Sequence, residues 1–232
     1  MGGVVEAVRN WWQPYAPTRP EYIVGLDLGK AQDYTALAVL EMRLAAPAFS
    51  PGPETIYHCR HLQRFKLGTS YPTIVSSVRE LCWREPLLTF RPRLAVDMTG
   101  VGSPVVDLLR QAMINADLEP ILIHGGDHAV NENGTWRVPK RELVGVTQVA
   151  LQTGRLKIAR ELPEVGVLTR ELQNFQVSIS DSGFDSYNAR VGAHDDLVLA
   201  LAMALWLATC PQSKLENLEA DIVEALCNHT GK

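Results

Sequence analysis

The segment from Tyr22 to Leu40 (YIVGLDLGKAQDYTALAVL) consists of two apolar, strand-like runs joined by a glycine-containing turn, and the first run ends at Asp27. Removing a carboxylate from water costs on the order of several kcal/mol unless a cation or hydrogen-bond donors meet it. Asp27 therefore needs a partner within the fold, and a metal ion is the simplest one.

Further acidic residues lie in equally apolar surroundings. Asp97 follows a short apolar run in RLAVDMTGVG, and Asp195 and Asp196 precede the apolar part of AHDDLVLALAMALWLA. We expect the fold to bring these acids, which are far apart in the sequence, close to Asp27.

The composition is that of a globular protein and narrows the possible classes. The 232 residues are 46% hydrophobic, enough for one large domain with a substantial core. The net charge of -4 argues against non-specific nucleic-acid binding over the whole surface, but it allows a local basic groove.

The 4 cysteines form no CxxC pair, which indicates reduced thiols. No apolar run reaches the roughly 20 residues of a membrane span, and no signal segment opens the chain, so we expect a soluble protein without a membrane partner.

Hydrophobic periodicity predicts a mixed α/β chain. Three strand-like runs, at residues 22–28, 35–44 and 55–65, are joined by short connections, which favours an antiparallel meander. After them, helical patterns alternate with short apolar runs, which predicts parallel strands with helices on both faces of the sheet. The later elements are expected in this order: helix 71–85, strand 94–97, helix 103–116, strand 120–124, polar loop 125–139, helix 141–153, helix 163–175, hairpin 176–190 and buried helix 194–210.

The pattern also predicts how the chain is divided. Residues 1–20 carry prolines and aromatic residues without a clear period, which indicates a linker or leader. Residues 21–210 form the predicted domain. Residues 211–232 have apolar residues at helical spacing in an acidic segment, which predicts an amphipathic helical tail.

The order of the elements is that of the ribonuclease H-like fold. In that fold the first strand, the fourth strand and the start of the last helix carry the important acids, and Asp27, Asp97 and the pair Asp195 and Asp196 occupy these places. Mg²⁺ and Mn²⁺ prefer carboxylate oxygens, and two such ions about 4 Å apart catalyse phosphodiester hydrolysis. Each aspartate alone is more often a capping or turn residue; the joint pattern favours two divalent metal ions.

Four blocks of the sequence resemble, in order, the nuclease domain of the large terminase subunit of tailed bacteriophages. These blocks are GLDLGKAQDYTALAVLE, AVDMTGVGSPVVDLL, VPKRELVGVTQVALQTGRLKIA and AHDDLVLALAMALW. The resemblance implies a metal-dependent endonuclease that cuts concatemeric double-stranded DNA in the cytoplasm of a bacterial host during genome packaging. It also implies a small terminase subunit, a portal and an ATPase motor as partners. The chain has no phosphate-binding GxxxxGK[ST] loop, so we expect the motor to be separate.

The resemblance assigns individual residues. Asp27, Asp97 and the pair Asp195 and Asp196 would be the catalytic metal ligands, with Asp196 as the preferred member of the pair. Asp33, in the pattern DxGxxxD, and His194 would support the site from its surroundings. For His194 a capping or packing role is an equal alternative, and Asp33 could be a turn residue.

Basic residues are concentrated between positions 137 and 160, where the only acid is Glu142. Cations at the rim of a metal site would bind DNA phosphates without regard to sequence. A solvated helix face is the alternative for each of them. The candidate DNA-binding residues are Arg137, Lys140, Arg141, Arg155 and Lys157.

Three other functions fit parts of the pattern. A Holliday-junction resolvase or transposase-like nuclease would keep the fold and change the DNA substrate. An actin-like or sugar-kinase-like ATP-binding domain also begins with a DLG turn between two strands, although such proteins are usually much longer. An inactive remnant that binds DNA is the third alternative.

Overall fold

The fold is known from a computed structural model. The described residues are 19–29, 33–45, 53–100, 103–179, 185–189 and 194–210, and side chains are described for all of them except residues 174–179 and 185–189. The predicted tail, and all but the end of the predicted linker, lie outside the described residues.

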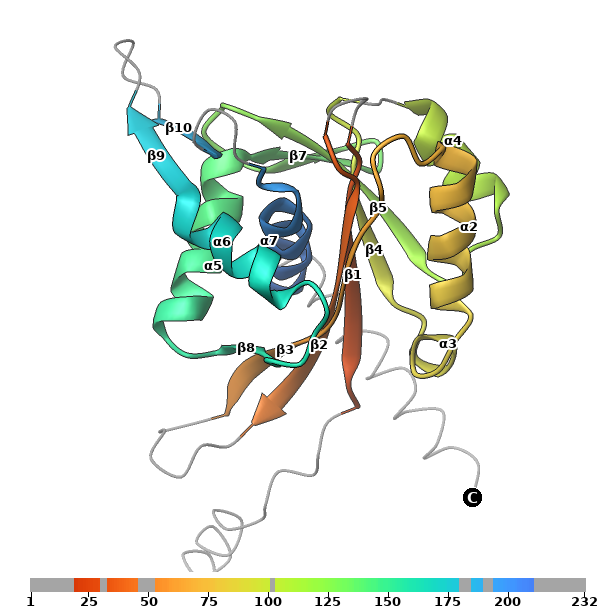
Figure 1. The fold of residues 1–232 in the computed structure, drawn as a ribbon, viewed down its shortest axis with the longest axis horizontal. Helices are drawn as coiled ribbons and strands as arrows, with labels where there is room; N and C mark the ends of the chain where they lie inside the picture. Colours follow the sequence, from red (N-terminus) through yellow and green to blue (C-terminus); the bar gives the residue numbers. More distant parts are fainter. Residues whose placement is uncertain are drawn as a thin grey trace, which may run out of the picture.

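A mixed eight-stranded sheet lies at the centre of the molecule, in the order β6-β7-β5-β4-β1-β2-β3-β8 (Figure 1). Strands β1 to β3 pair antiparallel, whereas β4 pairs parallel with β1, and β5 and β7 continue the parallel part. This arrangement confirms the predicted ribonuclease H-like sheet. The strands are β1 (Glu21–Asp27), β2 (Ala36–Ala45), β3 (Glu54–Arg64), β4 (Arg93–Asp97), β5 (Asp117–His124), β6 (Val130–Glu132), β7 (Thr135–Pro139) and β8 (Leu156–Ile158).

Helices cover both faces of the sheet, as predicted (Figure 1). Side chains alternate along a strand, so in β1 Ile23 faces one core and Val24 the other. One face carries α2 (Tyr71–Cys82), α3 (Leu87–Phe90) and α4 (Ser103–Gln111), and the other carries α5 (Lys140–Gln152), α6 (Val165–Asn174) and α7 (Asp196–Thr209). A separate hairpin of β9 (Phe175–Ile179) and β10 (Asp185–Ala189) follows α6, also as predicted. None of the helices in the described part of the chain is long and apolar enough to cross a bilayer.

Two predicted helices extended too far at their C-terminal ends. Helix α2 begins as expected, because the Ser70 side chain accepts a hydrogen bond from the Thr73 amide and a proline occupies the first turn. It ends at Cys82 instead of residue 85, since Pro86 disfavours helical backbone in the residue before it. Helix α4 likewise ends at Gln111 instead of residue 116.

The predicted polar loop over residues 125–139 was wrong in its second half. Strands β6 and β7 form a hairpin there, and β7 extends the sheet beside β5. Asn133 and Gly134 both have positive φ, 52° and 78°, as a two-residue hairpin turn requires. Two features of the sequence could have revealed this hairpin. One is the Asn-Gly pair, and the other is the pair of apolar residues at alternate positions, Trp136 and Val138, which are both buried.

Helix α7 lies directly against the centre of the sheet because β1 has a glycine at the contact. A Cβ atom placed on Gly25 would lie 1.9 Å from the backbone oxygen of Ala200. Asp27 lies two strand residues beyond Gly25, a rise of about 6.6 Å, and Asp196 lies four helix residues before Ala200, a rise of about 6 Å. The close contact therefore brings the start of α7 to the end of β1.

We expect Gly25→Ala to destabilise the protein by about 3 kcal/mol, because an overpacked core must displace backbone. The matched control is Gly145→Ala in α5, where an added Cβ meets nothing within 4 Å. This control should stabilise the protein by about 1 kcal/mol, because alanine favours helix over glycine. Urea unfolding measures both changes, and an unchanged free energy of unfolding for Gly25→Ala would contradict the contact.

Candidate functional site

Two of the predicted acids lie side by side at one edge of the sheet. Asp27 is the last residue of β1, and Asp97 is the last residue of β4. These strands are parallel neighbours with Leu26 opposite Val96, so their carboxyl ends coincide. The carboxyl groups of Asp27 and Asp97 are within hydrogen-bond reach of each other. The sequence predicted that the fold brings these two acids together, from the joint pattern of two strand ends and a helix start.

The start of α7 brings the other two acids to the same edge. Asp195 is the N-cap residue of α7 and Asp196 is its first helical residue. Both raise the pKa of Asp27 through their negative charge. The four acids Asp27, Asp97, Asp195 and Asp196 therefore share one electrostatic site, although 169 sequence positions separate Asp27 from Asp196.

The pKa of Asp27 lies well above its ordinary value, chiefly because the side chain is buried at 6% exposure. The negative charge of Asp97 is the next cause, followed by Asp196 and Asp195. Burial also raises the pKa of Asp196, against the opposing effect of Arg64. The site thus has a surplus of negative charge that a cation would relieve.

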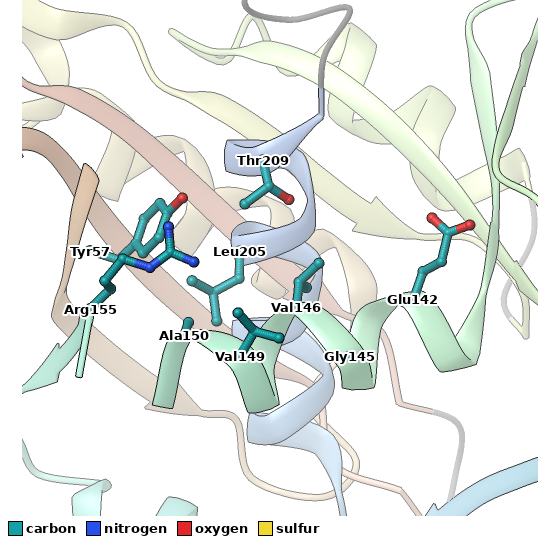
Figure 2. Close-up of a pocket in the computed structure, with 9 residues that line it drawn as sticks. All are labelled: Tyr57, Glu142, Gly145, Val146, Val149, Ala150, Arg155, Leu205 and Thr209. Carbon is teal, nitrogen blue, oxygen red and sulfur yellow. The ribbon is translucent and has the colours of Figure 1, made fainter. Parts of the chain in front are cut away.

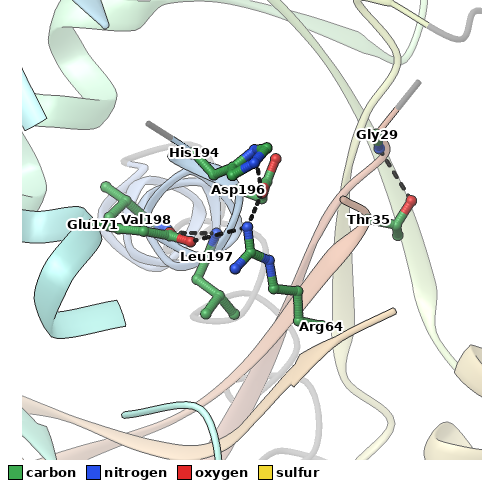
Figure 3. Close-up of polar contacts among 8 residues, drawn as sticks. All are labelled: Gly29, Thr35, Arg64, Glu171, His194, Asp196, Leu197 and Val198. Atoms are coloured by element: carbon green, nitrogen blue, oxygen red, sulfur yellow. Dashed lines mark hydrogen bonds and ion pairs between the residues drawn. The ribbon is translucent and has the colours of Figure 1, made fainter. Parts of the chain in front are cut away.

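Two basic side chains contact the acids at the start of α7. Lys140 Nζ lies 3.2 Å from Asp195 Oδ2, and the guanidinium of Arg64 donates to Asp196 Oδ2 at 3.0 Å. Figure 3 shows Arg64 reaching from the sheet toward Asp196. In the described part of the chain, no group of three or more His, Cys, Asp or Glu side chains is placed so that it could hold a metal ion. Each acid of α7 has one oxygen engaged by a basic side chain.

A buried glutamate that the sequence did not reveal supports this end of the site. Glu171 of α6 is 5% exposed, and its Oε2 atom accepts hydrogen bonds from the amides of Leu197 and Val198 at 2.9 and 3.1 Å (Figure 3). Burial raises the pKa of Glu171 to about 7. Its position within a predicted helix gave no signal, since glutamate is an ordinary helix residue.

Arg64 and Tyr34 were missed as well. The Arg64 guanidinium lies 3.8 Å from the centre of the Tyr34 ring, and the His194 ring meets Tyr34 edge-on at 5.0 Å. His194 Nδ1 also lies 3.7 Å from Asp196 Oδ2. The predicted supporting residue His194 therefore lies beside the acids, whereas Asp33 is exposed at the end of the turn after β1.

The candidate DNA-binding residues lie in two places. Lys140 and Arg141 are at the start of α5, near the acids, and Arg141 pairs with Asp127 at 2.7 Å. Arg137 on β7 lies 3.8 Å from Glu132. The second place, with Arg155 and Lys157, follows the end of α5. The 13 residues of α5 separate the two places by about 20 Å.

A hollow of about 330 Å³ lies between α5, the end of α7 and β3 (Figure 2). Apolar side chains such as Val146 and Leu205 line it, together with Arg155. Thr209, the last residue of α7, also lines it, whereas the acids lie at the first residues of that helix. The hollow is therefore separate from the acidic site.

Comparison with solved structures identifies the fold. The large terminase nuclease from thermophilic phage G20c with bound magnesium matches with a TM-score of 0.56 and 23% identity, over 83% of this chain and 84% of that one. The Thermus phage P74-26 large terminase nuclease domain matches with a TM-score of 0.53 and 20% identity, over 82% and 81%. Comparisons with protein-family models and with curated proteins found no match.

These observations define the class of protein by its fold. The chain has the ribonuclease H-like fold of large terminase nuclease domains. Its candidate site is the group of four acids where β1 and β4 end beside the start of α7.

We expect Asp27→Asn to raise the free energy of unfolding of the metal-free protein at neutral pH, because it removes a buried carboxyl whose charged form is disfavoured in the folded state. The folded state raises the pKa of Asp27, so above the unfolded pKa the folded chain retains a proton that the unfolded chain has lost. Stability therefore falls as pH rises through that range, and the substitution removes this loss. Urea unfolding between pH 4 and 7 in EDTA measures it.

The control for this measurement is Asp107→Asn, which removes an acid paired with Arg110 on the exposed face of α4. Its effect on stability should be small and nearly independent of pH. If Asp27→Asn is no more stable than the wild type at pH 7, the folded protein does not disfavour the charged form of Asp27.

Proposed function

We propose that the chain is a metal-dependent DNA endonuclease of the large-terminase type. The observation that carries the proposal is the meeting of three carboxylates, those of Asp97, Asp195 and Asp196, with the buried Asp27 at the end of the sheet. The shared fold with large terminase nuclease domains, one of them with bound magnesium, supports the same conclusion. The substrate would be concatemeric double-stranded DNA that is cut during genome packaging.

The residues present fit divalent metal ions. The four groups offer only carboxylate oxygens, which Mg²⁺ and Mn²⁺ prefer. Burial and, after it, the negative charges of the other three acids raise the pKa of Asp27, and bound cations would favour its charged form. Asp27, Asp97, Asp195 and Asp196 would hold two ions. When bound, such ions supply an activated water and stabilise the leaving oxygen of a phosphodiester.

The residues around the four acids would orient a carboxylate and bind DNA phosphates. His194, near Asp196, would orient that carboxylate, and Asp33 would line the entrance from the turn after β1. Lys140, Arg141 and Arg137 would bind DNA phosphates beside the acids, and Arg155 and Lys157 would extend the basic surface beyond the end of α5. A separate ATPase motor, a small terminase subunit and a portal would deliver the DNA.

Plasmid cleavage tests the proposal. We expect the wild-type chain to nick and linearise supercoiled DNA with Mg²⁺ or Mn²⁺ and to be inactive in EDTA. Asp27→Asn and Asp196→Asn should each slow cleavage by at least about 100-fold, because loss of even an indirect partner of a metal ligand costs 10- to 100-fold. Asp107→Asn is the control and should cleave like the wild type. A folded but inert wild type, or active Asp27→Asn, would contradict the proposal.

Substitutions in the two groups of basic residues should slow DNA cleavage to different extents. At low concentrations of metal ion and salt, we expect Lys140→Gln to slow DNA cleavage about tenfold, because a phosphate contact beside the acids is lost. Lys157→Gln, about 20 Å away at the other end of α5, should reduce it much less. Cleavage rates of the wild type and both variants, measured over a range of salt concentrations, test this prediction. Equal effects would show that the two residues serve one continuous DNA-binding surface.

A further inference from the structure

Helix α7 is capped by a side chain from another helix. Its N-cap residue is Asp195, yet the Asp195 side chain makes no capping hydrogen bond. The amides of the second and third helical residues, Leu197 and Val198, instead donate to Oε2 of Glu171. These are the two amides that the side chain of an N-cap residue normally accepts from.

The replacement leaves the carboxylate of Asp195 available for other contacts. An aspartate at the N-cap usually turns an oxygen toward the helix amides, and capping would then occupy that oxygen. Here the Asp195 carboxylate contacts Lys140 at 3.2 Å and acts on Asp27 through its charge. Glu171 thus performs the capping that would otherwise occupy an acid of the site.

Arg64 connects the same glutamate to the second acid of α7. Its guanidinium lies 3.0 Å from Asp196 Oδ2 and 3.8 Å from Glu171 Oε1. The Arg64 side chain is 16% exposed, and it stacks on Tyr34. Because a stacked, largely buried guanidinium has few alternative positions, Arg64 holds Asp196 in a fixed direction.

We propose that Glu171 and Arg64 are positioning residues for the acids at the start of α7. Glu171 caps the helix so that Asp195 and Asp196 both face the ends of β1 and β4, and Arg64 fixes the orientation of Asp196. The part of this proposal that concerns metal binding rests on the proposed nuclease function. The part that concerns capping is independent of it.

A double-mutant cycle on stability tests the capping. In the wild type, Asp195→Ala should change the equilibrium constant of unfolding little, because the Asp195 side chain makes no capping hydrogen bond and its partly exposed ion pair with Lys140 contributes little to stability. In a Glu171→Ala background, Asp195 becomes the remaining cap, so the same substitution should increase that constant about fivefold, the usual effect of a lost cap. Urea unfolding in EDTA measures all four proteins. Equal effects of Asp195→Ala in both backgrounds would overturn the proposal.

Metal dependence tests the positioning. Glu171→Ala should raise the Mn²⁺ concentration for half-maximal cleavage, and the Mn²⁺ dissociation constant measured by calorimetry with the full chain, each by about tenfold. Glu171→Gln keeps an oxygen that can accept from both amides, so it should remain within about threefold of the wild type. A purely structural role would lower the amount of folded protein without changing the Mn²⁺ requirement.

The controls separate the possible failures. Glu161→Ala removes an exposed glutamate shortly before α6 and should change neither measurement. If Glu171→Gln loses metal binding as fully as Glu171→Ala, metal binding requires the charge of Glu171 and not its cap, and the positioning proposal for Glu171 fails. If the wild type neither binds Mn²⁺ nor cleaves DNA, the proposed nuclease function fails, while the stability cycle still decides whether Glu171 replaces Asp195 as the cap.

Discussion

The site depends on the repulsion among four carboxylates, of which one, that of Asp27, is buried. Asp27 is almost inaccessible to water, and three other acids act on it, so its charged form is disfavoured. A protein that retains such an arrangement must balance the charge from elsewhere. In the described part of the chain, Arg64 and Lys140 provide part of that balance at Asp196 and Asp195. Divalent cations are proposed to provide the rest.

The rest of the fold brings the four acids together and holds them there. Parallel pairing of β1 with β4 places two strand ends at one edge of the sheet, and Gly25 lets α7 approach β1 closely enough to add its first residues. The buried apolar surface of α7 fixes that helix against the sheet. Because burial of apolar surface is the main stabilising term in folding, it can offset the repulsion concentrated at the site.

Much of the fold could be predicted from the sequence, since strand and helix periodicities differ and α7 is apolar on all sides. The hairpin of β6 and β7 was missed because β6 is entirely exposed and carries no hydrophobic pattern. The end of α2 was misplaced because the prediction extended the helix beyond Cys82, the last buried residue of its apolar face, toward Pro86. Local pattern therefore predicted the buried elements better than it predicted exposed elements and boundaries.

The sequence by itself determined the order of most elements and singled out the four acids as candidate ligands, because an acid at the end of an apolar run stands out from its neighbours. Only the tertiary structure decided what surrounds them. Arg64 is 132 positions from Asp196, and Glu171 is 26 positions from the amide of Leu197 that it caps. Such contacts depend on how β3, α6 and α7 pack together. No local pattern encodes that packing, because an arginine at a strand end and a glutamate in a helix are both ordinary on a solvated surface.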